Sequence, residues 1–569
     1  MRYASNTGGS TSGYLCALSL LAVLAMPTQA GVLSGTVSAG DGTPIAGAIV
    51  SVTDARGRSQ AVYSLEDGTY RLDTGLTGAL EVLGRKRYHE DAKLSLTLGA
   101  EAAESRDFTL DAITDPKALS DAHPALSHFS MMAFDDDPNA LFSRPNFARD
   151  CLTCHQLGNA FTRWQRPAES WLPTVQRMHG YLGDASEDDI RARSAFLAKS
   201  FDGRLATSRP TVPYDPMLAQ ATIYRWSLDD AVVPHDAEFD EENHRIYISE
   251  MFAGELLEVN LDNGDVKHMK LPDDGMPPGG MFAKMGLPSP YGLTISRSPH
   301  SLTKGHDGRW YLSDSVGAAI TAFDPKTGEF QNYDMEKGSL YPHTIRTGLD
   351  GRIWFSITFS DQIGRFDPKT GEMTVIDLPK TPSLSTPGTT VPYGVAIHPE
   401  TGGIWYAKLA SDKIGHIDPE TLEVTEYDSP VRAPRRQRFD KQGYLWVAGF
   451  SDGAIARIDT RTMDAKVIAL PVFAEGEIPA PYALAVHPDT QDIWINDTMN
   501  DVAWRYIQAE ERFVVYPLVL RGTYTRDFTF THKGWACTAS NPIPPAALEG
   551  GVPELICIDG GSPGGVASR

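Results

Sequence analysis

A repeat that runs from residue 218 to residue 562 restricts the fold more than any other feature of the chain. Its period is roughly 40 to 55 residues, which is the range of β-propeller blades. Each copy begins with a segment expected to form the inner strand, followed by a turn and by a strand that contains an aromatic residue. A later turn has a sequence such as Asp324-Pro-Lys-Thr-Gly328. Asp, Pro and Gly at such positions make hairpin turns. The repeat therefore predicts blades of four antiparallel strands around a common axis.

The copies give six complete blades and a seventh that lacks an outer strand after Asp559. Residues 221–228 precede the first blade and have the outer-strand pattern. If they complete the last blade, the ring closes without an unpaired edge, so we expect seven blades. Cys537 and Cys557 fall on the second and third strands of the last blade, where we expect a disulfide in an oxidising compartment.

Shorter segments flank the propeller. Residues 1–30 have a basic start, an apolar run and small residues before Ala30, which predicts a cleaved signal peptide. Residues 31–112 alternate apolar and polar positions between turns, as in a small β-sandwich. Residues 113–145 lose this pattern and are expected to be a linker. Residues 563–569 are expected to be a disordered tail.

Residues 146–205 contain the motif Cys151-Leu-Thr-Cys154-His155. Two thiols at this spacing can form thioethers with the vinyl groups of a haem, and the following histidine can bind the iron. A zinc site and a dithiol or disulfide are the alternatives, but zinc needs two more ligands. Met178 is the candidate sixth ligand of the iron, with His179 as its competitor and an open iron as a further possibility.

Helical patterns surround this motif. Residues 146–150 suit a short helix, residues 168–181 place Trp171 and Val175 on one face, and Ser186 is a suitable cap for a further helix. This is the smallest plan of a cytochrome c domain, so haem c is the expected cofactor. The expected fold class is mainly β: a seven-bladed β-propeller with an N-terminal β-sandwich and a small α-helical cytochrome c domain.

The innermost strands of a propeller surround an axial channel, so residues at one phase of the repeat converge there. The second residue of each expected inner strand is His, Tyr or Arg, where a structural filler would be aliphatic. These candidate catalytic residues are His235, Tyr291, His343, Tyr393, Arg435, Tyr482 and Arg526. The other propeller histidines, including His300, are expected to have surface or packing roles. Two axial histidines are too few for a multi-histidine copper cluster.

Carboxylates recur at a second phase, near the ends of the second strands. Glu250, Asp314 and Asp497 occupy it, with Lys408 at the same phase. Such a set can bind a divalent cation such as Mg or Ca, or act as acid and base. Alternatively, these carboxylates accept hydrogen bonds from backbone groups at the starts of loops.

The repeats, with "DGRIWF" and "IGRFDPKTG", resemble the streptogramin (virginiamycin B) lyase family of seven-bladed propellers. This resemblance implies a histidine base and a glutamate-bound magnesium, for which the chain offers His235, His343 and Glu250. The phrase "GTVSAGDGTPIAGAIVSVTD" resembles the carboxypeptidase-regulatory-like β-sandwich. The spacing from Trp171 to Met178, with the acidic cap that follows, resembles small periplasmic cytochrome c domains.

The formal net charge of −22 argues against a nucleic-acid partner and favours a basic partner protein. After the signal peptide no segment is long and apolar enough for a membrane span. An exported protein with covalent haem is expected in the periplasm. Its expected partners are a small-molecule substrate and a redox partner protein.

Three functions are compatible with these features. The first is a periplasmic oxidoreductase or electron-transfer enzyme, with a substrate pocket on the propeller axis and a haem that carries electrons. The second is a metal-dependent lyase of the streptogramin lyase type with an accessory haem domain. The third is a non-enzymatic electron-transfer or docking subunit.

Overall fold

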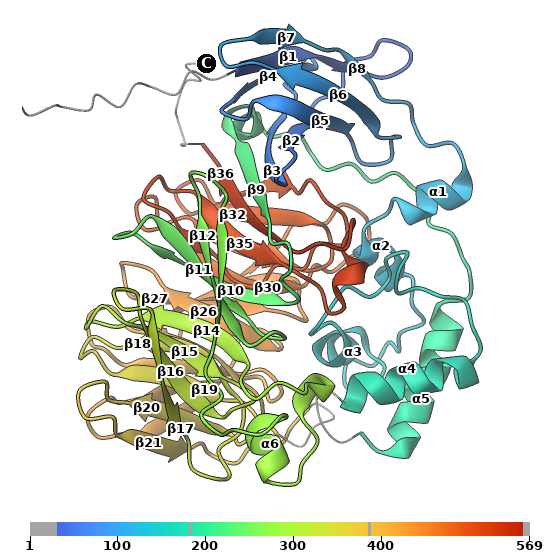
Figure 1. Cartoon of the computed structure of the whole chain (residues 1–569). Helices are drawn as coiled ribbons and strands as arrows, with labels where there is room; N and C mark the ends of the chain where they lie inside the picture. Colours follow the sequence, from blue (N-terminus) through green and yellow to red (C-terminus); the bar gives the residue numbers. More distant parts are fainter. Residues whose placement is uncertain (1–30, 181–184, 385–388, 562–569) are drawn as a thin grey trace, which may run out of the picture.

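A computed structural model describes residues 31–180, 185–384 and 389–561. It contains an N-terminal region of two sheets, a small helical region and a propeller (Figure 1). The expected signal peptide and C-terminal tail lie outside the described residues. Among the helices described, none combines the length and apolarity needed to cross a membrane.

The N-terminal region is a β-sandwich. One sheet has the order β4-β1-β7, with β8 also paired to β1, and the other has the order β3-β2-β5-β6. Apolar residues from both sheets, such as Leu33, Leu72, Val50 and Val82, form one buried core. The strands are β1 (Gly31–Ser38), β2 (Ile49–Asp54), β3 (Arg58–Tyr63), β4 (Thr69–Thr74), β5 (Gly78–Arg85), β6 (Ala92–Leu98), β7 (Ala103–Ser105) and β8 (Phe108–Thr109).

The helical region begins earlier than the sequence pattern indicated. Residues 113–145, expected to be a linker, contain two short helices, and Leu126 and Phe129 are buried. These side chains pack in one core with Phe147, Trp171 and other residues of the helical region, which is why the segment is folded. The helices are α1 (Pro116–Asp121), α2 (Ala125–Ser130), α3 (Arg144–Cys151), α4 (Ala168–Gly180) and α5 (Glu187–Ser200), followed by the short helix η1 (Pro216–Gln220).

Six four-stranded antiparallel sheets form blades one to six of the propeller, and the strands of blade seven belong to an eight-stranded sheet. Blade one is β10 (Pro234–Asp240), β11 (Arg245–Glu250), β12 (Glu255–Asn260) and β13 (Val266–Lys270). Blade two is β14 (Pro299–Lys304), β15 (Trp310–Asp314), β16 (Ala319–Asp324) and β17 (Glu329–Asp334). Blade three is β18 (Pro342–Thr347), β19 (Ile353–Ile357), β20 (Gln362–Phe366) and β21 (Met373–Asp377). The insertion between blades one and two holds α6 (Gly280–Lys284) and η2 (Pro290–Gly292).

The remaining blades follow the same order. Blade four is β22 (Pro392–Ile397), β23 (Ile404–Lys408), β24 (Lys413–Ile417) and β25 (Val424–Asp428). Blade five is β26 (Pro434–Phe439), β27 (Tyr444–Gly449), β28 (Ala454–Asp459) and β29 (Ala465–Ala469). Blade six is β30 (Pro481–Val486), β31 (Ile493–Asp497), β32 (Val502–Ile507) and β33 (Arg512–Pro517). Blade seven has β34 (Thr529–Phe530), β35 (Ala536–Ser540) and β36 (Glu554–Asp559), with η3 (Pro545–Ala547) between the last two.

The early strand β9 (Thr222–Ser227) completes blade seven by pairing antiparallel with β36. This pairing confirms the expected closure of the ring. The other edge of β9 pairs with β3, so the sheet of blade seven continues into the sandwich. A disulfide joins Cys537 on β35 to Cys557 on β36, as expected. The edge that would otherwise face solvent is therefore covered by the N-terminal region.

Candidate functional site

The axial residues are positioned by a local irregularity that recurs in the blades. In six blades the pairing register shifts directly after the proline that opens the inner strand. Such a bulge changes the direction of a side chain. The second residue of the inner strand in each of blades one to six lines one axial cavity of about 100 Å³, and blade seven contributes the residue after Thr525, which precedes β34. These residues are His235, His300, His343, Tyr393, Arg435, Tyr482 and Arg526.

Blade two differs from the prediction. Its inner strand opens at Pro299-His300, whereas Pro290 and Tyr291 belong to η2 in the preceding insertion. The spacing to the second strand could have revealed this. Pro299 lies 11 residues before β15, as in other blades, whereas Pro290 lies 20 residues before it. Tyr291 still lines the axial cavity, but His300 is the residue that the sequence analysis missed.

Serines on the second strands fix this ring from blade to blade. The Ser249 hydroxyl donates to the His300 carbonyl at 2.7 Å, and Ser356 donates to the Tyr393 carbonyl at 2.7 Å. Ser313 bonds the His343 carbonyl in the same way. Each of these bonds ties an axial residue to the preceding blade, so neighbouring ring residues are held in fixed positions.

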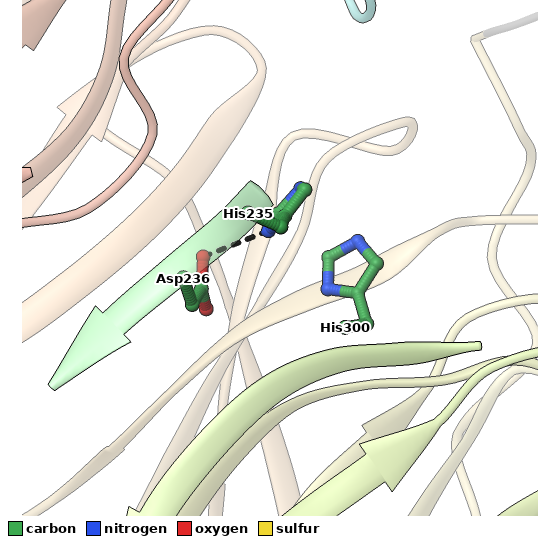
Figure 2. Close-up of side chains that lie close together, drawn as sticks. All are labelled: His235, Asp236 and His300. Atoms are coloured by element: carbon green, nitrogen blue, oxygen red, sulfur yellow. Dashed lines mark hydrogen bonds and ion pairs between the residues drawn. The ribbon is translucent and has the colours of Figure 1, made fainter. Parts of the chain in front are cut away.

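His235, Asp236 and His300 form a compact buried group on this ring (Figure 2). The His235 Nδ1 lies 2.9 Å from the Asp236 carboxylate, and Arg436 donates to both oxygens of the same carboxylate. His300 faces this pair, and its Nδ1 has no partner among the described residues. A cation there would have to compete with the Arg436 guanidinium. The carboxylate instead fixes His235 with Nδ1 as the protonated nitrogen.

The axial imidazoles are neutral at ordinary pH. Burial, followed by the charge of Arg526, lowers the pKa of His235 to about 3. Burial also holds the pKa values of His300 and His343 well below their usual range. Rings of His235, His300, His343 and Tyr393 follow one another with centroid distances of 3.9, 3.8 and 4.0 Å. The result is a continuous aromatic wall that offers neutral donors and acceptors.

Tyr393, the last ring of this wall, forms a pair with Tyr482. The hydroxyls of Tyr393 and Tyr482 are 2.6 Å apart, and Arg435 Nη2 donates to the Tyr393 oxygen at 2.8 Å. Burial opposes ionisation of Tyr482, but the charges of Arg435, Arg526 and Arg436 outweigh it and lower the pKa of this phenol. Tyr482 is therefore the axial hydroxyl that loses a proton most readily.

The second-phase carboxylates do not converge on the axis. Glu250 accepts hydrogen bonds from the N–H groups of Val232, Val233 and Ala253. Asp314 accepts from Ser298 and Gly317, and Asp497 accepts from Met499, Asn500 and Trp504. None of the three lines the axial cavity. Their role is the one left open as the alternative: each satisfies donors within its own blade.

The Cys-X-X-Cys-His motif lines a second cavity, of about 490 Å³. Cys151 and Cys154 are free thiols. His155 Nδ1 lies 2.7 Å from the carbonyl oxygen of Gln156, which makes Nδ1 the donor and leaves Nε2 to bind a metal. Both Met178 and His179 line the same cavity. Its wall also contains apolar and aromatic residues: Phe147, Leu157, Phe161, Trp164, Trp171, Val175, Leu197 and Pro544.

These residues fit a c-type haem. Both thiols, a histidine with a free Nε2 and two candidate opposite ligands border a space of the size that holds small cofactors. Arg166 and Arg177 also line it and suit the carboxylates of a haem. A zinc site fits less well, because zinc ligands converge on one ion. Among the residues described, the compact group of potential ligands is the axial one, and it does not include Cys151, Cys154 or His155.

The two cavities adjoin. Asp150, Thr153 and His179 line both of them. The docking is fixed by bonds between the helical region and the propeller: Gln156 donates to Asp501 and to the Thr523 carbonyl, and the Ile543 N–H donates to the Cys154 carbonyl at 3.1 Å. The motif therefore covers one end of the axial cavity.

Comparison with known proteins places a similarity on the propeller. The model of the virginiamycin B lyase family matches residues 279–507, which run from the insertion before blade two to β32. No curated protein matches. Virginiamycin B lyase from Staphylococcus aureus is 17% identical, with a TM-score of 0.47 over 59% of this chain and 99% of its own. A streptogramin B lyase is 18% identical, with a TM-score of 0.48 over 60% and 98%. YCF48 bound to a D1 peptide is 11% identical, with a TM-score of 0.44 over 63% and 99%. The sandwich and the helical region lie outside the family match.

Proposed function

We propose that the protein is an exported haem c oxidoreductase whose small-molecule substrate binds in the axial cavity. The observation that carries this proposal is the wall that the two cavities share, formed by Asp150, Thr153 and His179. A substrate on the axis would be separated from a group in the second cavity by single side chains. Electrons could then pass over a short distance without a mobile carrier.

The chain's own residues would hold the haem. Cys151 and Cys154 would form the thioethers, His155 Nε2 would bind the iron, and Met178 or His179 would supply a second ligand. When bound, a haem supplies one-electron oxidation or reduction of a neighbouring molecule and exchange with a redox partner protein. The acidic chain favours a partner with a basic surface.

Tyr482 is the proposed proton acceptor for substrate oxidation. Tyr393 accepts an N–H from Arg435, so its own hydroxyl can donate to the Tyr482 oxygen. Three guanidinium groups lower the pKa of Tyr482 against the effect of burial. In its ionised form, Tyr482 could therefore take up the proton of a substrate hydroxyl or amine on the axis and become a neutral phenol. The neutral imidazoles of His235 and His343 would orient the substrate.

The test uses protein exported together with a c-type haem maturation system. The haem should remain attached after denaturation, and Cys151→Ala with Cys154→Ala should abolish the attachment. Anaerobic mixing of the ferric protein with a panel of hydroquinones and phenolic acids should reduce the haem. Tyr482→Phe should slow that reduction by about 10²-fold or more, which is the usual effect of losing an acid–base group.

Tyr506→Phe is the matched control, because this tyrosine lies on β32 outside the axial cavity. It should leave the rate of haem reduction unchanged. Absence of covalent haem, or equal rates in Tyr482→Phe and the wild type, would refute the proposal.

A second candidate is a lyase of the virginiamycin B lyase type, and the family match to residues 279–507 favours it. His235 or His343 would act as the base. Glu250, the expected magnesium ligand, is instead bonded to backbone N–H groups away from the cavity. Magnesium-dependent ring opening of virginiamycin B that persists in Cys151→Ala, followed by chromatography, would select this function over the redox one.

A further inference from the structure

The axial cavity contains arginines without carboxylate partners. Arg435 and Arg526 both line it and are each 1% exposed. Among the described residues, neither lies within ion-pair distance of an Asp or Glu. The nearby arginines differ: Arg346, Arg436 and Arg438 all pair with Asp527. Asp527 and Asp236 are thus already paired with other arginines.

The Arg435 guanidinium is enclosed but not satisfied. Rings of Tyr393, Phe450 and Tyr482 surround it, with centroids 4.6, 4.3 and 3.7 Å from its central carbon. Its Nη2 donates to Tyr393, whereas Nε and Nη1 have no acceptor among the described residues. Burying a cation without a counter-ion costs free energy. Cation–π contacts offset only a part of that cost.

Arg526 is held at one end only. Its Nη1 donates to the backbone and side-chain oxygens of Asn541. The other N–H groups have no acceptor among the residues described. Unlike Nε and Nη1 of Arg435, they are not among the buried unpartnered atoms of the described residues. Arg526 therefore has donors available to a molecule in the cavity.

Arg149 and Asp150, two charged residues of the helical region, also line the cavity. They do not supply the missing negative charge. Arg149 pairs with Asp412 at 2.8 Å, and Asp150 pairs with Arg193 at 2.6 Å. Each of these residues is compensated by its partner. The wall formed by Arg435 and Arg526 therefore retains a net positive charge, consistent with the lowered pKa of Tyr482.

The size and walls of the cavity restrict the ligand further. A volume of about 100 Å³ corresponds to roughly seven to ten water-sized particles, at about 10 to 15 Å³ for each. The rings of His235, His300, His343 and Tyr393 follow one another along this wall, each tilted by 42 to 49° to the next. A small aromatic molecule fits the volume and can pack against such rings.

We propose that the axial cavity binds a small aromatic carboxylate, with Arg526 as its direct ion-pair partner and Arg435 as the second cation that attracts it. The planar fork of a guanidinium matches a carboxylate, and the imidazole wall would pack against the aromatic ring. This inference rests on the proposed function only for the ligand's role as substrate. Binding itself requires no redox step.

The first experiment is calorimetric titration of the haem-loaded protein with benzoate and with benzamide, its neutral counterpart. Benzoate should bind and benzamide should not. Arg526→Gln and Arg435→Gln should each weaken benzoate binding about tenfold or more, which is the usual effect of losing a charged hydrogen-bond donor. Arg438→Gln is the matched control, since Arg438 lies on the same strand as Arg435 but outside the cavity, and its affinity should equal that of the wild type.

Thermal unfolding without ligand separates a binding role from a structural one. Because an unpaired buried cation is unfavourable, Arg435→Gln should melt at the wild-type temperature or above it. A lower melting temperature together with unchanged benzoate affinity would overturn the role of Arg435. If Arg435→Gln does not fold, Arg526→Gln alone decides the proposal, and wild-type affinity in that variant overturns it.

A carboxylate in this cavity could also be a haem propionate, although propionates leave the porphyrin at the edge opposite the vinyl groups that Cys151 and Cys154 would capture. Titration of the Cys151→Ala, Cys154→Ala variant distinguishes the two sources. Benzoate binding to both the haem-loaded and the haem-free protein supports a free carboxylate ligand. Binding to the haem-free protein alone would overturn the proposal. Benzoate binding without haem reduction by any phenolic acid would refute the proposed function and leave this inference intact.

Discussion

At the scale of single residues, Asp236 connects the axial ring to the propeller interior. Its carboxylate accepts from His235 and from two nitrogens of Arg436, and all three residues are buried. Replacing it by Asn keeps the shape but removes the charge. Because removal of one partner of a buried ion pair leaves the other charge uncompensated, Asp236→Asn should lower the free energy of unfolding by about 3 to 5 kcal/mol.

Denaturant unfolding at pH 7 measures this effect. The control is Asp428→Asn, because Asp428 pairs with Lys413 at 2.6 Å while 92% exposed. That change should cost less than about 1 kcal/mol. Equal losses of unfolding free energy in the two variants would show that the buried ion pair stabilises the protein no more than the exposed one.

The axial histidines should make the protein sensitive to acid. Burial lowers the pKa of His343 well below its model-compound value of 6.5, so the folded state stays neutral while the unfolded chain takes up a proton. The stability that the folded state gains from keeping His343 neutral is fully present above pH 6.5 and is lost as the pH falls below it. Between pH 6.5 and pH 5 this amounts to about 2 kcal/mol for one histidine.

His343→Gln should therefore reduce the difference in unfolding free energy between pH 7 and pH 5 by about 2 kcal/mol. Denaturant unfolding at the two pH values measures the difference. His268→Gln is the control, because His268 lies on the outer strand β13 beside Glu255. The same pH dependence in His343→Gln and the wild type would contradict the burial argument.

Most of the axial ring could be predicted from the sequence, because the proline that opens an inner strand marks the phase of the repeat. His235, His343, Tyr393, Arg435 and Tyr482 all follow such a proline and line the cavity. The prediction failed in blade two because the insertion contains a second Pro-aromatic pair. Glu250, Asp314 and Asp497 also recur at one position of the repeat. Regular spacing alone cannot distinguish a side chain that faces the axis from one that accepts hydrogen bonds at the start of a loop.

At the scale of elements, the closure of blade seven depends on strands from both ends of the chain. β9 pairs with β36 on one side and with β3 on the other, and the disulfide lies on the neighbouring pair of strands. The phase of the repeat predicted the first pairing. No pattern in β3 or β9 indicated the second, because an outer strand looks the same whether its free edge meets solvent or another sheet.

The disulfide should stabilise this closure. It links residues 20 positions apart, and for a loop of that length the chain-entropy contribution is about 3 kcal/mol. The Cys537→Ser, Cys557→Ser double variant should lose roughly that amount in denaturant unfolding, as should the wild type after reduction. A thiol assay on the unfolded, unreduced wild type should detect neither cysteine. Two reactive thiols from this pair would contradict the assignment.

At the scale of the whole molecule, the helical region covers one end of the propeller axis (Figure 1). The contacts that hold it there join residues hundreds of positions apart, such as Arg149 with Asp412 and Gln156 with Asp501. Local sequence patterns predicted the helices and the Cys-X-X-Cys-His motif. They do not indicate how the helical region docks on the propeller. The adjacency of the two cavities, on which the proposed function depends, could therefore be found only from the structure.

The proposed function depends on a covalent haem that lies beside the axial cavity. The most direct measurement is anomalous X-ray diffraction at the iron edge, on crystals of the protein exported with a c-type haem maturation system. We expect one iron atom in the cavity lined by Cys151, Cys154 and His155, bound by His155 and by Met178 or His179. Absence of iron from that cavity, or an iron bound between His235 and His300 instead, would contradict it.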